Sequence, residues 1–274
     1  MLEDIQGKKV LVSGAGTGIG RGIALGFAEA GASVALHYSH SGDGAASAAK
    51  EINDAGGKAK TFQADFSDAQ EVLDLGKEAL AWLGGMDALV NNAGITFNRA
   101  IEETTVEQYD RLYSVNVRAP YFLSQAVVPT MSKQGSGSII NLSSVHAFEG
   151  MTHHSVYAGT RGAIKAFTRQ LAIELAPRGI RVNAIAPGAI FVENYLKAMP
   201  DFEEASLGSS IPAGFVGAPR DIANMAIYLA SDAARFILGQ TILVDGGTTS
   251  WMPFSEDFKE AFGGQFGQGY VPGT

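Results

Sequence analysis

The stretch VLVSGAGTGIGRGIA, residues 10–24, decides the fold of this 274-residue chain. A short apolar run, typical of a buried strand, leads into Gly14, Gly18 and Gly20 and then into the apolar spacing of a helix. Residues without a Cβ let backbone N–H groups approach an anion at the positive end of the helix dipole. Placed between a first strand and a first helix, the stretch predicts a site for the pyrophosphate of a dinucleotide. An ordinary glycine-rich turn is the alternative.

The alternation of strand and helix continues along the chain. Apolar runs such as SVALHY and IRVNAIAPG alternate with helical patterns at residues 19–31, 106–114, 119–133, 155–176 and 219–230. This order predicts the α/β class: a single-domain Rossmann fold, with a doubly wound parallel β-sheet and helices on both faces. We expect residues 1–250 to form the dinucleotide-binding and catalytic domain. Residues 251–274, rich in glycine and aromatic residues, are expected to be a C-terminal tail that docks on the body or on a neighbouring subunit.

Composition narrows the class of protein. The chain is 46% hydrophobic and carries a net charge of −8, so it is a poor candidate for binding nucleic acid or an anionic membrane. It has no cysteine, which excludes disulfides and thiolate metal sites. No apolar run approaches the roughly 18 residues of a membrane span, and no signal peptide is evident at the start. A soluble cytoplasmic protein is expected.

A second stretch, residues 143–167, suggests proton-transfer chemistry. It contains Ser144, Tyr157 thirteen positions later, and Arg161 one helical turn after that. Tyrosine titrates near pH 10, so a tyrosine base at neutral pH needs a nearby cation. Positions i and i+4 share a helix face, so Arg161 should lie beside Tyr157. The alternative is a buried tyrosine and a serine at a strand end.

Four motifs together resemble the short-chain dehydrogenase/reductase family, and its sugar and polyol dehydrogenases in particular. They are the Gly-x-x-x-Gly-x-Gly turn, NNAG at residues 91–94, the Ser144/Tyr157 pair and PG at residues 187–188, and the resemblance covers residues 5–247. It implies a homotetramer. It also implies that Tyr157 exchanges a proton with the substrate while hydride moves to or from a nicotinamide. Ser144 would steady the substrate oxygen, and Asn116 would hold a water.

Arg161 departs from the family, which has a lysine at this position. That lysine contacts the cofactor ribose and lowers the pKa of the tyrosine. Arginine keeps the charge and can donate to ribose hydroxyls, but it does not readily release a proton. Lys165, eight residues after Tyr157, lies too far round the helix to replace the lysine. The predicted catalytic residues are therefore Asn116, Ser144, Tyr157 and Arg161.

The turn and the resemblance together predict the cofactor site. Its residues are Gly14, Thr17, Gly18, Ile19, Gly20, Tyr38, Ser39, Asp65, Phe66, Asn92, Ala93, Gly94, Tyr157, Arg161, Pro187, Gly188 and Ile190. Asp65 would accept a hydrogen bond from the adenine amino group, or would instead cap the helix after Ser67. Asn91 and Asn92 would alternatively hold strand ends together. Tyr38 stands where NAD-binding chains usually carry an acid, yet the turn has no Arg or Lys. NADP(H) is slightly favoured over NAD(H).

Substrate contacts are expected on two segments. His146, Glu149 and His154 lie in the segment between Ser144 and Tyr157. Glu193 and Asn194 come directly after the residues that are predicted to contact the nicotinamide. Polar side chains suit a polyhydroxylated substrate, whereas a fatty acyl chain would need an apolar site; the alternative for each residue is a solvent-facing loop. The histidines do not have the spacing of metal ligands, and no metal is expected.

The predicted function is an NAD(P)-dependent oxidoreductase that interconverts a secondary alcohol or hemiacetal and a carbonyl. A sugar or polyol dehydrogenase acting on a small molecule is favoured, with no nucleic acid or membrane partner. One alternative is a 3-oxoacyl carrier-protein reductase. The other is a weakly catalytic or inactive cofactor-binding sensor, suggested by Arg161 and by Val192, where the family often has threonine.

Overall fold

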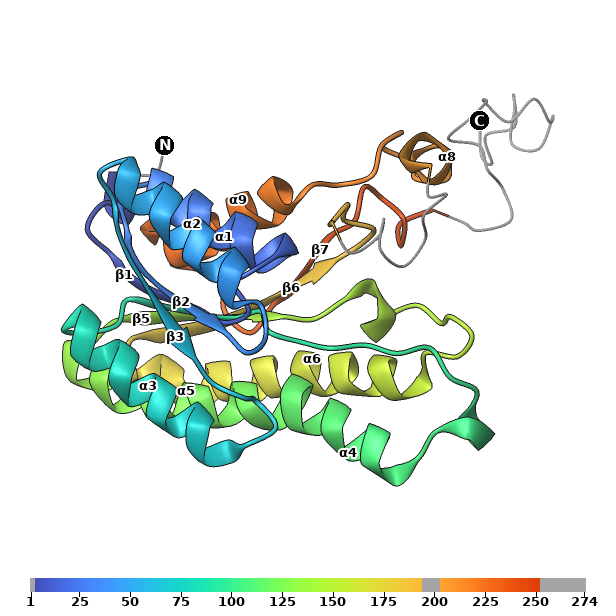
Figure 1. Ribbon diagram of the computed structural model, residues 1–274, viewed down its shortest axis with the longest axis horizontal. Helices are drawn as coiled ribbons and strands as arrows, with labels where there is room; N and C mark the ends of the chain where they lie inside the picture. Colours follow the sequence, from blue (N-terminus) through green and yellow to red (C-terminus); the bar gives the residue numbers. More distant parts are fainter. Residues whose placement is uncertain (1–2, 194–202, 252–274) are drawn as a thin grey trace, which may run out of the picture.

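The computed structural model describes residues 3–193 and 203–251, and it is built around one parallel sheet (Figure 1). The sheet has seven strands in the order β3-β2-β1-β4-β5-β6-β7. The strands are β1 (Lys9–Val12), β2 (Ser33–Tyr38), β3 (Lys58–Gln63), β4 (Ala88–Asn91), β5 (Gly137–Leu142), β6 (Ile180–Pro187) and β7 (Thr241–Val244). Every neighbouring pair is parallel, which confirms the predicted fold class.

Helices cover both faces of the sheet, and Figure 1 shows the two layers. One layer contains α1 (Gly18–Glu29), α2 (Gly42–Asp54) and α9 (Pro219–Ala230); the other contains α3 (Ala69–Leu83), α4 (Val106–Tyr113), α5 (Ala119–Gln134) and α6 (Ser155–Leu175). The short α8 (Glu204–Gly208) lies beyond the end of β7. The shorter turns are η1 (Glu3–Ile5), η2 (Ile101–Glu103), the π-helical η3 (Ser114–Arg118), η4 (Val145–Ala147), η5 (Ala176–Arg178) and η6 (Asp232–Ala234).

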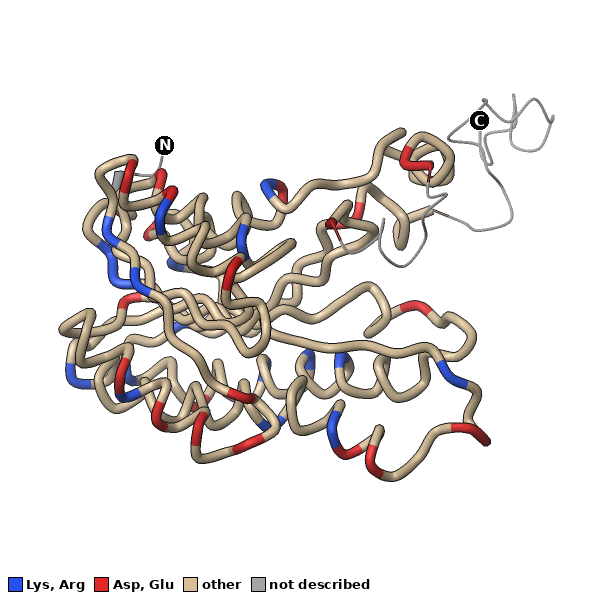
Figure 2. The backbone as a smooth tube through the Cα atoms, viewed as in Figure 1, with Lys and Arg blue, Asp and Glu red and all other residues tan. Residues whose placement is uncertain are grey.

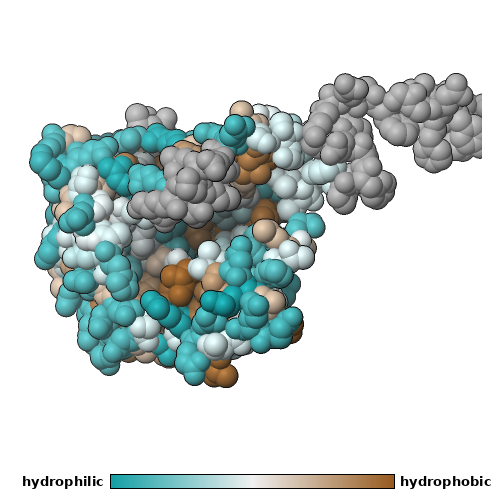
Figure 3. Space-filling view, turned by 45° about the vertical axis from the view of Figure 1, so that its right-hand side comes forward, coloured by the Kyte–Doolittle hydropathy of each residue, from teal (hydrophilic) through white to brown (hydrophobic). Residues whose placement is uncertain are grey.

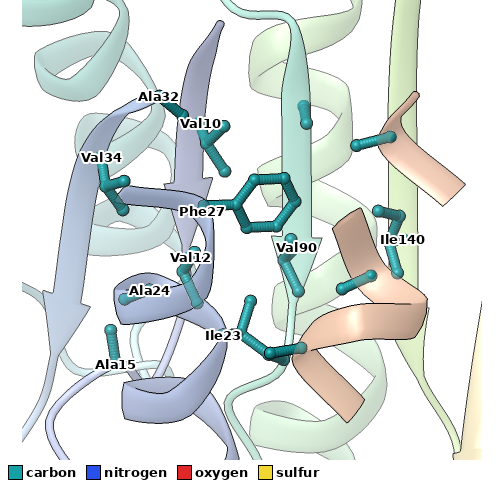
Figure 4. Packing of buried hydrophobic residues seen from close by; sticks show 14 of the residues in the cluster. Val10, Val12, Ala15, Ile23, Ala24, Phe27, Ala32, Val34, Val90 and Ile140 are labelled. Carbon is teal, nitrogen blue, oxygen red and sulfur yellow. The ribbon is translucent and has the colours of Figure 1, made fainter. Parts of the chain in front are cut away.

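The strands are apolar because both of their faces are buried. Along β1, Val10 and Val12 pack toward α1 and α9, whereas Leu11 packs toward the opposite layer. In Figure 4 the ring of Phe27, on α1, lies over Val10, Val12 and Val90. Fully burying a side chain of this size stabilises the fold by roughly 1.5–3 kcal/mol. Figure 2 shows most charged residues on helices and loops.

The direction of winding reverses between β1 and β4, and the carboxyl ends of these strands are linked by side chains. Asn92 Nδ2 donates to Ser13 O at 2.9 Å, and Ser13 Oγ accepts from the backbone N–H groups of Asn92 and Ala93 at 3.0 Å. Asn91 Nδ2 donates to Asn141 Oδ1 at 2.8 Å, joining β4 to β5. The expectation that these asparagines hold strand ends together is confirmed. Such a reversal point is where doubly wound folds bind their ligands.

Candidate active site

A cleft of about 540 Å³ opens at the reversal point between β1 and β4. Figure 3 shows the hollowed face, with apolar side chains inside the hollow and hydrophilic ones around it. Of the predicted cofactor residues, the cleft is lined by Gly14, Thr17, Gly18, Ile19, Gly20, Ser39, Asp65, Phe66, Asn92, Ala93, Gly94 and Arg161. Tyr38, Tyr157, Pro187, Gly188 and Ile190 do not line it.

The glycine turn has the shape that the sequence predicts for an anion site. Gly14 and Gly18 have φ angles of 67° and 53°, which side chains rarely adopt. A Cβ on Gly20 would lie 2.1 Å from Gly14 O, so the two backbone segments need a glycine there. Thr17, the N-cap of α1, makes no side-chain capping bond. The first N–H groups of α1 therefore remain available to an anion such as a pyrophosphate.

His37, which the sequence analysis did not single out, holds this turn in place. Its Nδ1 accepts from Gly14 N at 3.1 Å, and its Nε2 donates to Ala64 O at 3.0 Å. Its ring stacks on Phe66 with centroids 4.1 Å apart. Burial lowers the pKa of His37 to about 4, so the ring is neutral at pH 7. The only available signal was a histidine inside an apolar strand, and neither partner could be inferred from that.

Ser39, His40 and Ser41 form the wall of the cleft after β2. Tyr38 instead packs over Gly42, where a Cβ would lie 3.2 Å from the Tyr38 ring. This wall is polar, and its described part contains no acid.

Asp65 and Arg111 line the same cleft, and the charges of His40 and Arg111 both act on Asp65. Asp65 Oδ1 accepts from Ser67 N at 2.9 Å. This bond lowers the pKa of Asp65 most, the Ser67 hydroxyl adds to the effect, and the charges of His40 and Arg111 contribute less. The N-cap of α3 is Asp68, so the alternative that Asp65 caps this helix is wrong. Arg111, a cation on α4, was missed because α4 is distant in sequence from the nucleotide turn.

Asn116 is buried in the π-helical turn η3 between α4 and α5. Its Oδ1 accepts from Ile95 N and its Nδ2 donates to Ile95 O, both at 2.9 Å. The same Nδ2 also donates to Thr160 Oγ1 at 3.2 Å. The amide therefore fixes the segment after β4 against α6, and both of its Nδ2 protons are occupied by protein groups.

Arg161 lies beside Tyr157, as the spacing predicts. Its guanidinium carbon is 4.8 Å from the centroid of the Tyr157 ring, and its Nη1 donates to Leu142 O at 2.9 Å. A Cβ on Gly94 would lie 2.4 Å from Arg161 Nη2, so the long side chain fits because residue 94 is a glycine. Lys165 reaches a different ring, with its Nζ 3.7 Å from the Phe148 centroid.

Three aromatic rings meet next to Ser144. The rings of His146 and His154 are 4.8 Å apart, and their centroids lie 5.8 Å and 6.0 Å from that of Tyr157. Ser144 Oγ accepts from the backbone N–H of His146 at 3.2 Å. The structure thus brings four of the predicted catalytic and substrate residues into one cluster.

The remaining predicted substrate residues are dispersed. Glu149 is exposed on the loop, and Glu193 lines the cofactor cleft. Asn194 lies outside the described residues. Two apolar side chains on the same loop, Phe148 and Met151, are 37% and 56% exposed, so the mouth of the site is not uniformly polar.

The PG pair has a structural reason of its own. A Cβ on Gly188 would lie 2.7 Å from the Cα of Asp245, and Gly188 N donates to Val244 O at 3.0 Å. The ends of β6 and β7 can therefore approach each other only through a glycine. Val192 lines the cleft against Gly18, with its Cγ1 3.1 Å from where a Cβ on Gly18 would stand.

Residues 3–193 and 203–251 contain neither a metal-binding cluster nor a membrane-spanning helix. No three His, Cys, Asp or Glu side chains gather there in a way that would hold a metal ion. None of the helices in these ranges has the length and apolar character of a membrane span.

The family model described as enoyl-(acyl carrier protein) reductase matches residues 14–249. The chain belongs to the short-chain dehydrogenase/reductase family. It is 38% identical to 3β-hydroxysteroid dehydrogenase 1 of Eggerthella lenta over 271 residues, 98% of this chain and 100% of that protein. It is 38% identical to an L-rhamnose 1-dehydrogenase (NAD(P)+) of Sphingomonas sp., covering 89% and 96% of the two chains. A 3-oxoacyl-[acyl-carrier-protein] reductase of Staphylococcus aureus is 40% identical, covering 88% and 97%.

Solved structures of short-chain dehydrogenases/reductases superpose on the whole domain. One, provisionally described as an NAD(P)-dependent gluconate 5-dehydrogenase of Beutenbergia cavernae with bound NADP, has a TM-score of 0.85 and 38% identity over 92% of this chain and 100% of its own. A 7α-hydroxysteroid dehydrogenase with NADH has a TM-score of 0.84 and 36% identity, over 89% and 96%. This short-chain dehydrogenase/reductase is therefore an oxidoreductase that acts on CH–OH groups with a nicotinamide cofactor. The glycine cradle and the first turn of α1 fit such a cofactor.

Proposed function

We propose that this short-chain dehydrogenase/reductase interconverts a secondary alcohol or hemiacetal of a sugar or polyol and the corresponding carbonyl. The observation that carries the proposal is the position of His146 and His154, whose rings pack edge-on against Tyr157. Imidazole nitrogens can donate to or accept from hydroxyl groups beside the reacting carbon. The rhamnose and gluconate dehydrogenases among the similar proteins support the same substrate class.

The catalytic roles that we propose follow from the contacts of each side chain. Tyr157 exchanges a proton with the substrate oxygen, with the fixed charge of Arg161 against its ring. Ser144 Oγ already accepts a bond from His146 N, so the hydroxyl proton can be donated to the substrate oxygen. Asn116 holds Ile95 and α6 in position. A nicotinamide bound in the cleft would supply or receive the hydride.

We propose a slight preference for NADP(H) over NAD(H). Ser39, His40 and Ser41 stand at the end of β2 and the start of α2, and no described acid joins them in that wall of the cleft. A 2′-phosphate would meet hydroxyl donors there, with the cation Arg111 on the same cleft. Adding NADPH or NADH to the protein and following its fluorescence gives the dissociation constant of each cofactor. Replacing His40 with Asp should shift their ratio toward NADH by more than tenfold, and an unchanged ratio would contradict this assignment.

A hydroxysteroid is the second candidate substrate, and one observation favours it. The match to the Eggerthella lenta enzyme spans 271 residues, so it extends into residues 252–274, whereas the rhamnose dehydrogenase match spans 245. The exposed Phe148 and Met151 would suit an apolar ring system. The deciding experiment is reduced-nicotinamide absorbance with a panel of sugars, polyols, hydroxysteroids and a 3-oxoacyl thioester. Turnover of sugars alone would support the proposal, and turnover of another class alone would replace it.

The sensor alternative is separated from catalysis by Tyr157→Phe. An oxidoreductase should lose at least about 10²-fold in kcat while still binding NADPH, because only the proton-transfer group is removed. A cofactor sensor would show no turnover in either form and the same affinity in both.

The assembly that we propose is a cytoplasmic homotetramer, with residues 1–250 as the catalytic domain and residues 251–274 as a docking tail. Val106 and Tyr121, on α4 and α5, are 70% and 50% exposed, as expected of a subunit interface. Light scattering of the full chain and of a chain ending at residue 250 tests both parts of this proposal. A monomeric full chain would contradict the tetramer, and the same oligomeric state and substrate affinity in both chains would contradict docking.

A further inference from the structure

The proton that Tyr157 exchanges with substrate must also leave or enter the site. A lysine beside the tyrosine can take part in that transfer because it can be deprotonated, whereas arginine stays charged at any relevant pH. Arg161 is 7% exposed, and its Nη1 is bound to Leu142 O. The charge beside Tyr157 is therefore retained, and a side chain that can pass on the proton must be sought elsewhere.

His146 has the position that this transfer requires. Its ring centroid lies 5.8 Å from that of Tyr157, with the planes at 75°. Its Nδ1 is buried and makes no hydrogen bond with any described residue. Its backbone N–H is fixed by Ser144 Oγ, so the ring is anchored next to the group that steadies the substrate oxygen. His154 stacks on His146 and also contacts Tyr157, and its Nδ1 is bonded to Thr152 O at 3.1 Å.

The surroundings of His146 keep it neutral at pH 7. From α6 and the start of that helix it faces Tyr157, Arg161 and His154, and its own loop contributes Glu149. The neighbouring end of β6, residues 184–187, consists of apolar residues. Burial lowers the pKa of His146 most, the charges of His154 and Arg161 lower it further, and a bond with the Glu149 backbone opposes them. A neutral imidazole with a free ring nitrogen can accept a proton.

We propose that His146 accepts the proton from Tyr157 and returns it, taking over the proton transfer that Arg161 cannot perform. The inference rests on the oxidoreductase chemistry proposed above, not on a particular substrate. In oxidation, the substrate C–H bond breaks and its electron pair leaves as hydride, which a bound oxidised nicotinamide would accept. The substrate O–H bond breaks and its proton passes to Tyr157. His146 takes that proton from the Tyr157 hydroxyl and then releases it to solvent. Each alcohol thus yields one carbonyl, one reduced cofactor and one proton.

The first test is a double-mutant cycle with His146→Ala and Arg161→Lys on the full chain, measured with the best substrate of the panel. With Arg161 present, His146→Ala should lower kcat by about 10²-fold at pH 7, with KM changed less. In the Arg161→Lys background, His146→Ala should lower kcat by less than about threefold, because the lysine restores a titratable group beside Tyr157. Added imidazole should restore the rate of the His146→Ala variant in a saturable manner.

The matched control is His153→Asn. His153 lies on the same loop, is exposed, and has a φ angle of 63°, a conformation that asparagine tolerates. Its replacement should leave kcat and the pH profile unchanged. An equal loss from His146→Ala in both backgrounds, or the absence of rescue by imidazole, would show that His146 only packs and would overturn the proposal.

A second measurement does not need turnover. Histidine ring signals of the full chain, followed by NMR against pH, should show His146 neutral at pH 7 and shifted by Tyr157→Phe. A His146 ring that is protonated at pH 7, or that does not respond to Tyr157→Phe, overturns the proposal whatever the substrate. Failure of sugars on the panel with success of a steroid or thioester refutes only the proposed substrate class, and the cycle is then measured with the active compound.

Discussion

Mild acid should destabilise this protein through His37, the buried histidine under the glycine turn. The neutral ring accepts from Gly14 N and donates to Ala64 O, so a protonated ring cannot keep both bonds. Its pKa is about 4 in the folded chain, against an ordinary value of 6.5. As the pH falls below about 6.5, the unfolded chain binds a proton before the folded chain does, and stability is lost down to about pH 4. Above that window the ring stays neutral in both states, so His37 makes no contribution to the pH dependence of stability.

The magnitude follows from the difference between the two pKa values. At about 1.4 kcal/mol per unit of pKa, the full loss approaches about 3 kcal/mol at pH 4. The same linkage gives a loss of about 2 kcal/mol between pH 7 and pH 5. This is a large fraction of the roughly 5–15 kcal/mol that stabilises an ordinary domain.

Urea unfolding at pH 7 and pH 5 measures this loss in the protein and in His37→Gln. Glutamine can donate to Ala64 O in place of the ring, yet it does not titrate. Other groups contribute equally to both proteins, so the His37 contribution is the difference between their two losses of unfolding free energy. We expect His37→Gln to have the lower free energy of unfolding at pH 7. Between pH 7 and pH 5 it should lose about 2 kcal/mol less of that free energy than the unsubstituted protein does. Equal losses in the two proteins would refute the assignment of a low pKa to His37.

Three further substitutions test other parts of the site. Gly20→Ala puts a Cβ 2.1 Å from Gly14 O, so the affinity for NADPH, measured by fluorescence, should fall at least tenfold. The control is Gly162→Ala on α6, where a Cβ meets nothing within 4 Å. It should raise the free energy of unfolding by about 1 kcal/mol and leave the affinity for NADPH unchanged. Arg161→Lys should raise kcat and change its pH profile, because lysine can exchange a proton; an identical profile would contradict the role given to the arginine. Asn91→Leu removes the bond to Asn141 Oδ1 and leaves that oxygen unpaired, so urea unfolding should show a loss of about 1–3 kcal/mol.

Local patterns were enough to predict the architecture. The glycine turn follows β1 at Gly14 and runs into the first turn of α1 at Gly18 and Gly20, where the sequence predicts the passage from strand to helix. Helices α4, α5, α6 and α9 begin and end within one residue of the predicted positions. Helix α1 ends at Glu29, two residues before the predicted end at Gly31, because Gly31 has a φ angle of 90° that a helix does not allow. Spacing within one helix also placed Arg161 beside Tyr157, since the i and i+4 positions share a face.

Contacts between distant segments could not be predicted in this way. His37 gained its role from Gly14 and Ala64, whose groups meet only in the folded sheet. Arg111 reaches the cleft from α4, far along the chain from the nucleotide turn. Sequence reasoning likewise missed that Gly188 is required by the backbone at Asp245. Each of these depends on strand order and register, which hydrophobic periodicity does not specify.

The bonds between Ser13 and Asn92 have a consequence for how the protein acquires activity. These residues are 79 positions apart, and they join the first half of the sheet to the second. The cradle for the cofactor is therefore incomplete until both halves have assembled, and closing so long a loop has an entropic cost. A refolding chain should regain helical circular dichroism before it can retain NADPH. Cofactor capture thus marks the completion of folding, and a nascent chain that ends before β4 should be unable to sequester it.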